Sequence, residues 1–164
     1  MYPVIWCSID SFLAAVAIGL VGRQRVRSYG LIAGFALCDG ISHALGRGIR
    51  VLPVSQVIAE LNPLITSLCL AGIVAVLMLL FVRTRPSVLW SVPLLLGLDN
   101  LLYGVLDTSG GIVALSFSSA LVSGLLAYAG FVVARNVGSI LPRPVATATA
   151  IMLVAISFTT VAGG

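Results

Sequence analysis

The feature that most constrains this chain is a series of apolar stretches, each close to the length of a membrane-spanning helix. About 20 predominantly apolar residues are needed to cross the hydrocarbon core of a bilayer. The chain is 60% hydrophobic and only 9% charged, whereas an average soluble domain carries roughly 25% charged residues. So few charges cannot cover the surface of a soluble protein, and the sequence therefore predicts an all-α, polytopic membrane protein.

Hydropathy and helix-breaking residues predict six transmembrane helices. Asn62 and Pro63 are suited to the N-cap and first position of one helix, and Pro86 and Pro144 precede two others. The expected ranges are Tyr2–Val21, Tyr29–Leu45, Leu64–Val82, Val88–Leu106, Ile112–Ala134 and Val145–Val161. The longest connection, Gly46 to Asn62, fits either a short helix at the membrane interface or a solvated loop.

The basic residues, all of them arginines, predict the orientation. Cytoplasmic loops of membrane proteins carry an excess of Lys and Arg. Seven of the nine arginines fall in the connections after the first, third and fifth helices, and only Arg47 and Arg50 fall on the opposite side. We therefore expect a multi-pass protein of the inner (plasma) membrane with both termini outside the cytoplasm. Orientation signals account for the net charge of +4 without nucleic-acid binding.

The N-terminal residues bear on whether a signal peptide is present, and the three cysteines bear on whether a metal or redox site is present. The start "MYPVIW" has no positive n-region and no cleavage site follows, so the first helix is expected to be retained. Cys7, Cys38 and Cys69 lie inside apolar stretches without paired CxxC spacing. Packing is therefore their default role.

A short internal similarity predicts two inverted repeats. "SIDSFLAAVAIG" in the first helix and "GLDNLLYGVL" in the fourth each place an aspartate and a small polar residue among apolar residues. Because three spans separate them, the second set is upside down relative to the first, as in many secondary transporters. We expect one transmembrane domain, 1–164, with three-helix repeats at 1–85 and 86–164.

Three aspartates, Asp10, Asp39 and Asp99, fall near the centres of predicted helices. Insertion scales assign an aspartate at that depth a cost of about 2.5 to 3.5 kcal/mol. Every arginine lies in a connection or at a helix end. The aspartates must therefore be protonated, accept hydrogen bonds from neighbouring helices, or bind a cation.

Residues near these aspartates suggest which cation. Asn100 follows Asp99 and offers a carbonyl, whereas His43 shares a helix face with Asp39. Oxygen ligands suit manganese or magnesium, and imidazole or the thiol of Cys7 would favour zinc or cadmium. The candidate metal-binding residues are Asp10, Asp39, Asp99, Asn100 and His43.

Small residues predict close approach of the second and fifth helices. Gly30 and Gly34 form a GxxxG pair in the second helix, and Ser119, Ser123 and Ala127 form a ladder in the fifth. Small residues at these spacings let helix backbones approach closely in membranes.

The stretch "DSFLAAVAIG" resembles the Asp-Ala-Phe-Ala-Val-Ser type motif of the bacterial manganese efflux pumps, a family of the lysine exporter superfamily. "GFALCDG" and "LDNLLYG" extend the resemblance more weakly. It implies six helices in two inverted halves, with Asp10 and Asp99 as paired acidic residues of the ion path and Asp39 as the acidic residue of the second helix.

These patterns favour a secondary transporter that exports a divalent cation, with manganese preferred, either in exchange for protons or driven by the membrane potential. The cation is then a substrate, no resident cofactor is needed, and the partners are the bilayer, the metal ion and protons, with homo-oligomerisation left open. The alternatives are an exporter of a small organic solute and a non-transporting assembly protein. An enzyme is disfavoured, because the last three helices lack a cysteine for a thiol relay and no GxSxG is present.

Overall fold

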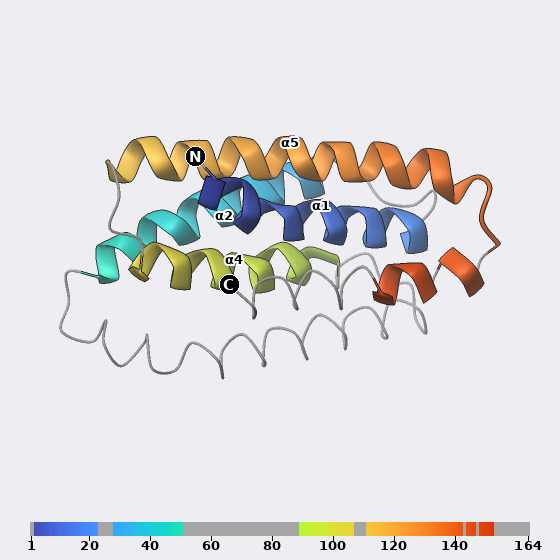
Figure 1. Cartoon of the computed structure of the whole chain (residues 1–164), viewed down its shortest axis with the longest axis horizontal. Helices are drawn as coiled ribbons and strands as arrows, with labels where there is room; N and C mark the ends of the chain where they lie inside the picture. The colour runs from blue at the N-terminus through green and yellow to red at the C-terminus, as the bar shows by residue number, and fades with distance from the viewer. Residues whose placement is uncertain are drawn as a thin grey trace.

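The computed structural model of the chain describes residues 2–22, 28–50, 89–106, 111–142, 144–146 and 148–152, with only the backbone given for residues 2–7, 22, 99 and 106. The described elements are helical, which confirms the all-α class. The four long helices are α1 (Tyr2–Gly22), α2 (Ser28–Ile49), α4 (Ser91–Leu106) and α5 (Ile112–Gly138) (Figure 1). A 3₁₀ turn at 89–90 precedes α4, and helical turns at 144–146 and 148–152 follow α5.

The predicted boundaries agree closely for α1 and α4, whereas α2 and α5 are longer than expected. Because α2 continues to Ile49, Gly46 and Arg47 belong to the helix and not to the connection in which we had placed them. The glycine is tolerated there because it packs directly against α4, and such packing overrides weak helix propensity. The predicted helix Leu64–Val82 and the remainder of the connection, 51–62, lie outside the described residues.

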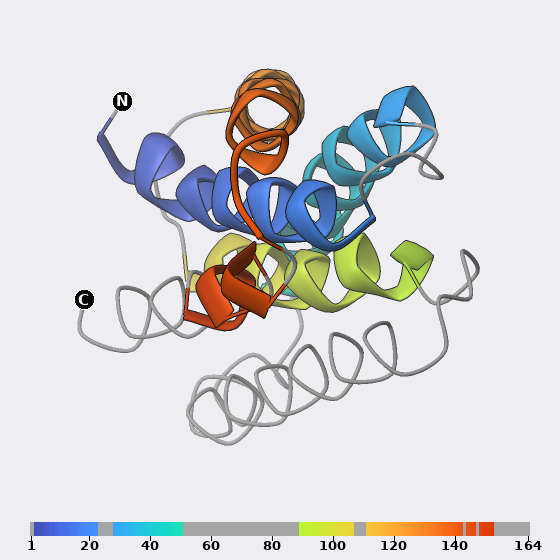
Figure 2. The ribbon, with the colours of Figure 1, turned by 90° about the vertical axis from the view of Figure 1, so that its right-hand side faces the viewer.

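The helices pack as two parallel pairs that point in opposite directions (Figures 1 and 2). α1 lies along α5, and α2 lies along α4. α2 also packs antiparallel against α5, whereas α1 and α4 touch only briefly. α2 and α5 therefore form the central contact of the described bundle, with α4 and α1 on its two sides.

The small residues have the predicted packing role only in part. Ser119, Ser123 and Ala127 are buried on one face of α5, as the ladder predicted. The GxxxG pair of α2, however, faces the ring of Trp90 at the start of α4 and not α5. The prediction that this pair brings α2 and α5 together is therefore wrong, because the large indole fills the groove that the glycines leave.

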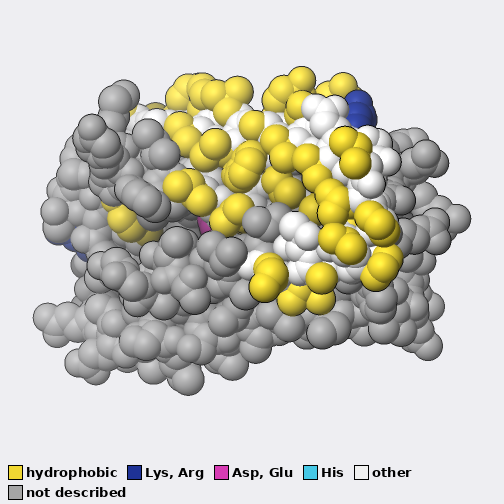
Figure 3. All heavy atoms as spheres, turned by 45° about the vertical axis from the view of Figure 1, so that its right-hand side comes forward, with side chains coloured by type: hydrophobic (Ala, Val, Ile, Leu, Met, Phe, Trp, Pro, Cys, Tyr) yellow, Lys and Arg dark blue, Asp and Glu magenta, His cyan; other side chains and the backbone are white. Residues whose placement is uncertain are grey.

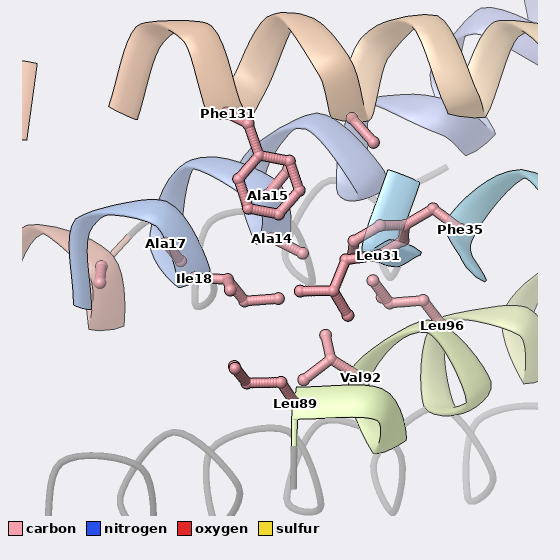
Figure 4. Packing of buried hydrophobic residues seen from close by; sticks show 12 residues of the cluster. Ala14, Ala15, Ala17, Ile18, Leu31, Phe35, Leu89, Val92, Leu96 and Phe131 are labelled. Atoms are coloured by element: carbon pink, nitrogen blue, oxygen red, sulfur yellow. The ribbon is translucent and has the colours of Figure 1, made fainter. Parts of the chain in front are cut away.

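An apolar core occupies the part of the bundle near the N-terminal end of α2. Leu31 and Phe35 of α2 meet Val92 and Leu96 of α4, with Phe131 of α5 above them (Figure 4). The helical turns after α5 contribute Ala146 and Ala150 to the buried clusters. The end of the bundle near the start of α2 is thus packed with apolar residues, and the buried polar residues lie toward its other end.

The outer faces of the bundle are strongly apolar. Leu37 and Ile41 of α2 and Leu121 and Leu125 of α5 are all exposed. In Figure 3 hydrophobic side chains cover the described part of the surface, and the basic side chains visible there lie at its ends. Such a band of apolar surface is typical of a protein that faces lipid.

Among the described residues, α5 alone is both long and apolar enough to cross a membrane. Its 27 residues correspond to about 40 Å of helix. The apolar parts of α1 and α4 that the structure describes, Ser8–Val21 and Ser91–Val105, are shorter. This supports a membrane protein in general terms, and the count of six spans stays a prediction.

Candidate functional site

The buried face of α2 changes from apolar to polar along its length. Leu31, Phe35, Asp39, His43 and Arg47 follow one another at intervals of four residues, and all are buried. This spacing aligns side chains on one face of a helix. The polar residues therefore start where the apolar core ends and continue to the C-terminal turn of α2.

Asp39 lies beside the first helix at the level of Ser11. The hydroxyl of Ser11 donates a hydrogen bond of 3.0 Å to Oδ2 of Asp39. The backbone N–H of the same serine donates to Oδ1 of Asp10 over 2.6 Å. Asp10 is 3% exposed and Asp39 is completely buried. Ser11 thus connects the carboxylates of two helices.

The fifth helix joins this group through Ser123. Its hydroxyl donates to the hydroxyl of Ser11 over 2.9 Å, so that donors run in order from Ser123 to Ser11 to Asp39. Each serine oxygen keeps a lone pair free of this chain, because a hydroxyl can accept two hydrogen bonds. Three helices therefore direct oxygen atoms to one buried point.

Asn100 brings the side-chain amide of α4 into the interior. It is 1% exposed, and neither its oxygen nor its nitrogen has a hydrogen-bond partner within the described part of the chain. A buried amide without partners costs about 1–3 kcal/mol. Asn100 follows Val92 and Leu96 at four-residue spacing, and these two pack beside Leu31 and Phe35. Gly97 of α4 faces Cys38 and Ser42 of α2, and since the two helices are parallel, Asn100 lies about one turn further along, near the level of His43.

His43 is engaged one turn further along α2. Its Nδ1 lies 3.2 Å from the hydroxyl of Ser116 on α5, and its ring lies 5.9 Å from that of Tyr103 on α4. Arg47 follows another turn along and is only 8% exposed. Arg47 lies in the last turn of α2, at a helix end as expected, but it is buried there, about 12 Å along the helix from Asp39.

The predicted metal ligands are thus placed unequally. Within the residues whose side chains are described, no three of His, Cys, Asp and Glu lie close enough together to hold a metal ion. Asp10 and Asp39 share Ser11, whereas His43 is hydrogen-bonded to Ser116. The side chain of Asp99 lies outside the description. A cation held by the described residues would therefore take its remaining ligands from other oxygens, such as those of hydroxyl groups, amides or water.

Sequence reasoning missed Ser11, Ser116 and Ser123 as polar members of the site. Serines in an apolar helix were expected to permit packing, and only the positions of their neighbours distinguish that role from hydrogen bonding. A signal was nevertheless present: "ALCDGISHALG" (36–46) and "ALVSGLLAYAG" (120–130) align without gaps. In that alignment Ser123 corresponds to Asp39.

The packing of the helices follows the same correspondence. A Cβ atom at Gly46 would meet the carbonyl of Leu101 and the nitrogen of Val105, whereas one at Gly130 would meet the carbonyl of Phe12 and the nitrogen of Val16. "DSFLAAV" (10–16) aligned with "DNLLYGV" (99–105) pairs Phe12 with Leu101 and Val16 with Val105.

The central crossing of α2 and α5 is equivalent from both sides as well. A Cβ at Gly40 would meet Ala120, and one at Gly124 would meet Ala36. The two alignments pair Gly40 with Gly124 and Ala36 with Ala120. The contact of α2 with α4 is therefore equivalent to the contact of α5 with α1. The crossing of α2 and α5 is equivalent to itself when the two halves are exchanged.

Comparisons with known proteins do not assign this chain. No family model matches it, and neither the curated proteins nor the solved structures contain a match. Its resemblance to the manganese efflux pumps therefore stays a prediction from the motifs.

Proposed function

We propose that the protein is a secondary transporter that exports a divalent metal cation, with manganese the favoured substrate. The observation that carries this proposal is Ser11, which binds the carboxylates of Asp10 and Asp39 from two helices at one buried point. Two ionised carboxylates held beside one serine repel each other. A divalent cation between them removes this repulsion and balances the charge.

The available ligands suit a hard cation. The group offers two carboxylates, the hydroxyls of Ser11 and Ser123 and the amide oxygen of Asn100. Magnesium-like cations commonly bind through one or two carboxylates with water in the remaining positions, and manganese prefers the same oxygen donors. Asp99 and His43 remain candidate ligands from the sequence, of which His43 would shift the preference toward zinc.

A transporter also needs access from both sides of the membrane. The equivalent contacts of Gly46 and Gly130 support the predicted inverted repeats, the general plan of many secondary transporters. Six spans, both termini outside the cytoplasm, and coupling to protons or to the membrane potential complete the proposal.

A metal-sensitivity panel tests the function directly. Cells with and without the protein are grown in manganese, zinc, cadmium, iron and magnesium, and a selective rise in tolerance to one metal is expected. Asp10→Asn and Asp99→Asn should each abolish that rise at unchanged protein abundance. Unchanged tolerance in these variants would contradict the cation site. It would favour an assembly protein, because an amide can still hydrogen-bond to a neighbouring helix.

The buried Arg47 favours a second candidate, an exporter of a small organic solute. The absence of a cation inside the bundle would disfavour this candidate, but Arg47 is buried on the same face of α2 as Asp39. A guanidinium and a carboxylate on one face would suit the two ends of a zwitterion. Export of organic amines or amino acids without a change in metal tolerance would support this alternative.

A further inference from the structure

The polar residues around Ser11 occupy positions that the two halves of the chain share. In the alignments above Ser11 corresponds to Asn100, and Asp39 corresponds to Ser123. We call these four residues the central quartet. All four are buried, and they come one each from α1, α4, α2 and α5.

The residue pair Ser123 and Ser11, which is joined by a hydrogen bond, has an equivalent pair within the quartet. Exchanging the two halves converts this pair into Asp39 and Asn100. Asn100 is 1% exposed, and its amide has no hydrogen-bond partner within the described residues. An amide in this position is suited to bind a ligand beside Asp39 through its oxygen.

We infer that the transported cation binds on the pseudo-two-fold axis between the halves, within the central quartet, and that Asn100 and Ser123 are its ligands from the second half. This inference rests on the proposed function and deepens it. The ligand class is a divalent cation that binds the carboxylate of Asp39 and the three neutral oxygens of the quartet in addition to the carboxylate of Asp10. Because the axis relates position 39 to position 123, a carboxylate in either position would have the same relation to an ion bound on the axis.

The equivalence can be tested by moving the carboxylate from one half to the other. Asp39→Ser removes the charge, and Asp39→Ser combined with Ser123→Asp restores it from α5. The matched control combines Asp39→Ser with Ser119→Asp, which places the carboxylate on the same buried face of α5 about one turn away. Manganese binding to the purified protein is measured by the loss of the free-ion paramagnetic resonance signal, and cell tolerance is measured in parallel.

We expect Asp39→Ser to weaken manganese binding at least about tenfold, because ligand charge largely sets the affinity of such sites. The Ser123→Asp combination should recover most of that loss, and the Ser119→Asp combination should recover none. Equal behaviour of the two combinations, whether both recover or both fail, overturns the inference. If the wild-type protein binds no manganese, both the proposed function and this inference fail. If the wild-type protein binds manganese but the two combinations behave alike, only this inference fails.

A second variant separates binding from folding. Asn100→Leu replaces a buried amide without described partners by an apolar side chain of similar size, which should raise the thermal unfolding midpoint of the purified protein. The same change should weaken manganese binding, because the amide oxygen is lost. A residue with a purely structural role would not produce higher stability together with weaker binding, so unchanged binding contradicts the assignment of Asn100.

Discussion

The two halves of the described bundle share their backbone packing but differ in chemistry. Gly46 and Gly130 make equivalent contacts with the opposite half, as do Gly40 and Gly124. Along the buried face, however, α2 carries Asp39, His43 and Arg47 where α5 carries Ser123, Ala127 and Phe131. The shared contacts are those that let helices approach, and the differing residues are those that bind and carry charge.

Helix packing and ligand binding place different requirements on the two halves. Close approach depends on the absence of side chains, so both halves must have glycine at the same positions. A binding site needs the charge of Asp39 only once, so α2 alone is sufficient to supply it. The polar group consequently extends from the centre toward the C-terminal end of α2, whereas the opposite end is closed by the apolar core.

The largest expected effect separates Asp39 from its counterpart Ser123. Asp39→Asn should reduce metal tolerance to that of cells without the protein, because the amide cannot supply the negative charge that the cation needs. Ser123→Ala removes one neutral oxygen and should reduce tolerance only partly. Growth at graded manganese concentrations measures both changes.

Ser119→Ala is the control for this pair, since Ser119 is buried on the same face of α5 but outside the hydrogen-bond chain from Ser123 through Ser11 to Asp39. It should leave tolerance unchanged. Similar losses for Asp39→Asn and Ser123→Ala would break the chemical distinction between the halves.

The next effect is on stability and should be the same in both halves. Gly46→Ala and Gly130→Ala each place a Cβ against the backbone of the opposite half, where neither side can yield easily. Overpacking of this kind costs about 1–3 kcal/mol, and each variant should lower the thermal unfolding midpoint measured in detergent.

Gly48→Ala provides the control, because a Cβ at Gly48 meets nothing within 4 Å. Alanine there should stabilise the helix by about 0.5–1 kcal/mol. A clear difference between Gly46→Ala and Gly130→Ala would contradict the structural equivalence of the two contacts.

A smaller effect is expected at the residues present in only one half. His43→Ala, Ser116→Ala and the double variant form a cycle that isolates their hydrogen bond. The coupling energy should be about 1 kcal/mol, since one hydrogen bond between neutral side chains contributes about that much. A coupling near zero in unfolding measurements would remove the pair from the polar group.

The same variants also sharpen the role of His43 as a candidate ligand. If the imidazole contacts the ion, His43→Ala should lower tolerance to zinc more than tolerance to manganese, because imidazole favours zinc. Equal changes for the two metals would assign His43 to packing and hydrogen bonding alone.

The smallest effects should come from the outer faces. Leu37→Ala on α2 and Leu121→Ala on α5 change exposed side chains at equivalent positions. Each should alter stability by less than about 0.5 kcal/mol, as exposed substitutions usually do. A large loss for one of them, accompanied by a change in oligomeric size on a gel-filtration column, would identify that face as a contact between copies of the chain.

Much of the helical layout was predictable from residue order. The starts of α1 and α5 and the end of α4 fall within a residue of the predicted positions, because apolar stretches and flanking proline or glycine report local preferences. The ends of α2 and α5 were not predictable, because tertiary packing extends these helices. Gly46, for example, is held in helical form by its contact with α4.

The candidate site divides in the same way. The sequence determined that the chain is apolar and helical and that Asp10 and Asp39 lie within helices, because composition and hydrophobic runs are local properties. Only the tertiary structure decided that Ser11 joins these two carboxylates, that Ser123 completes the chain of donors, and that Arg47 is buried. The physical reason is that the rotation of each helix about its axis is set by what the neighbouring helices allow to approach, and no single stretch of sequence contains that information.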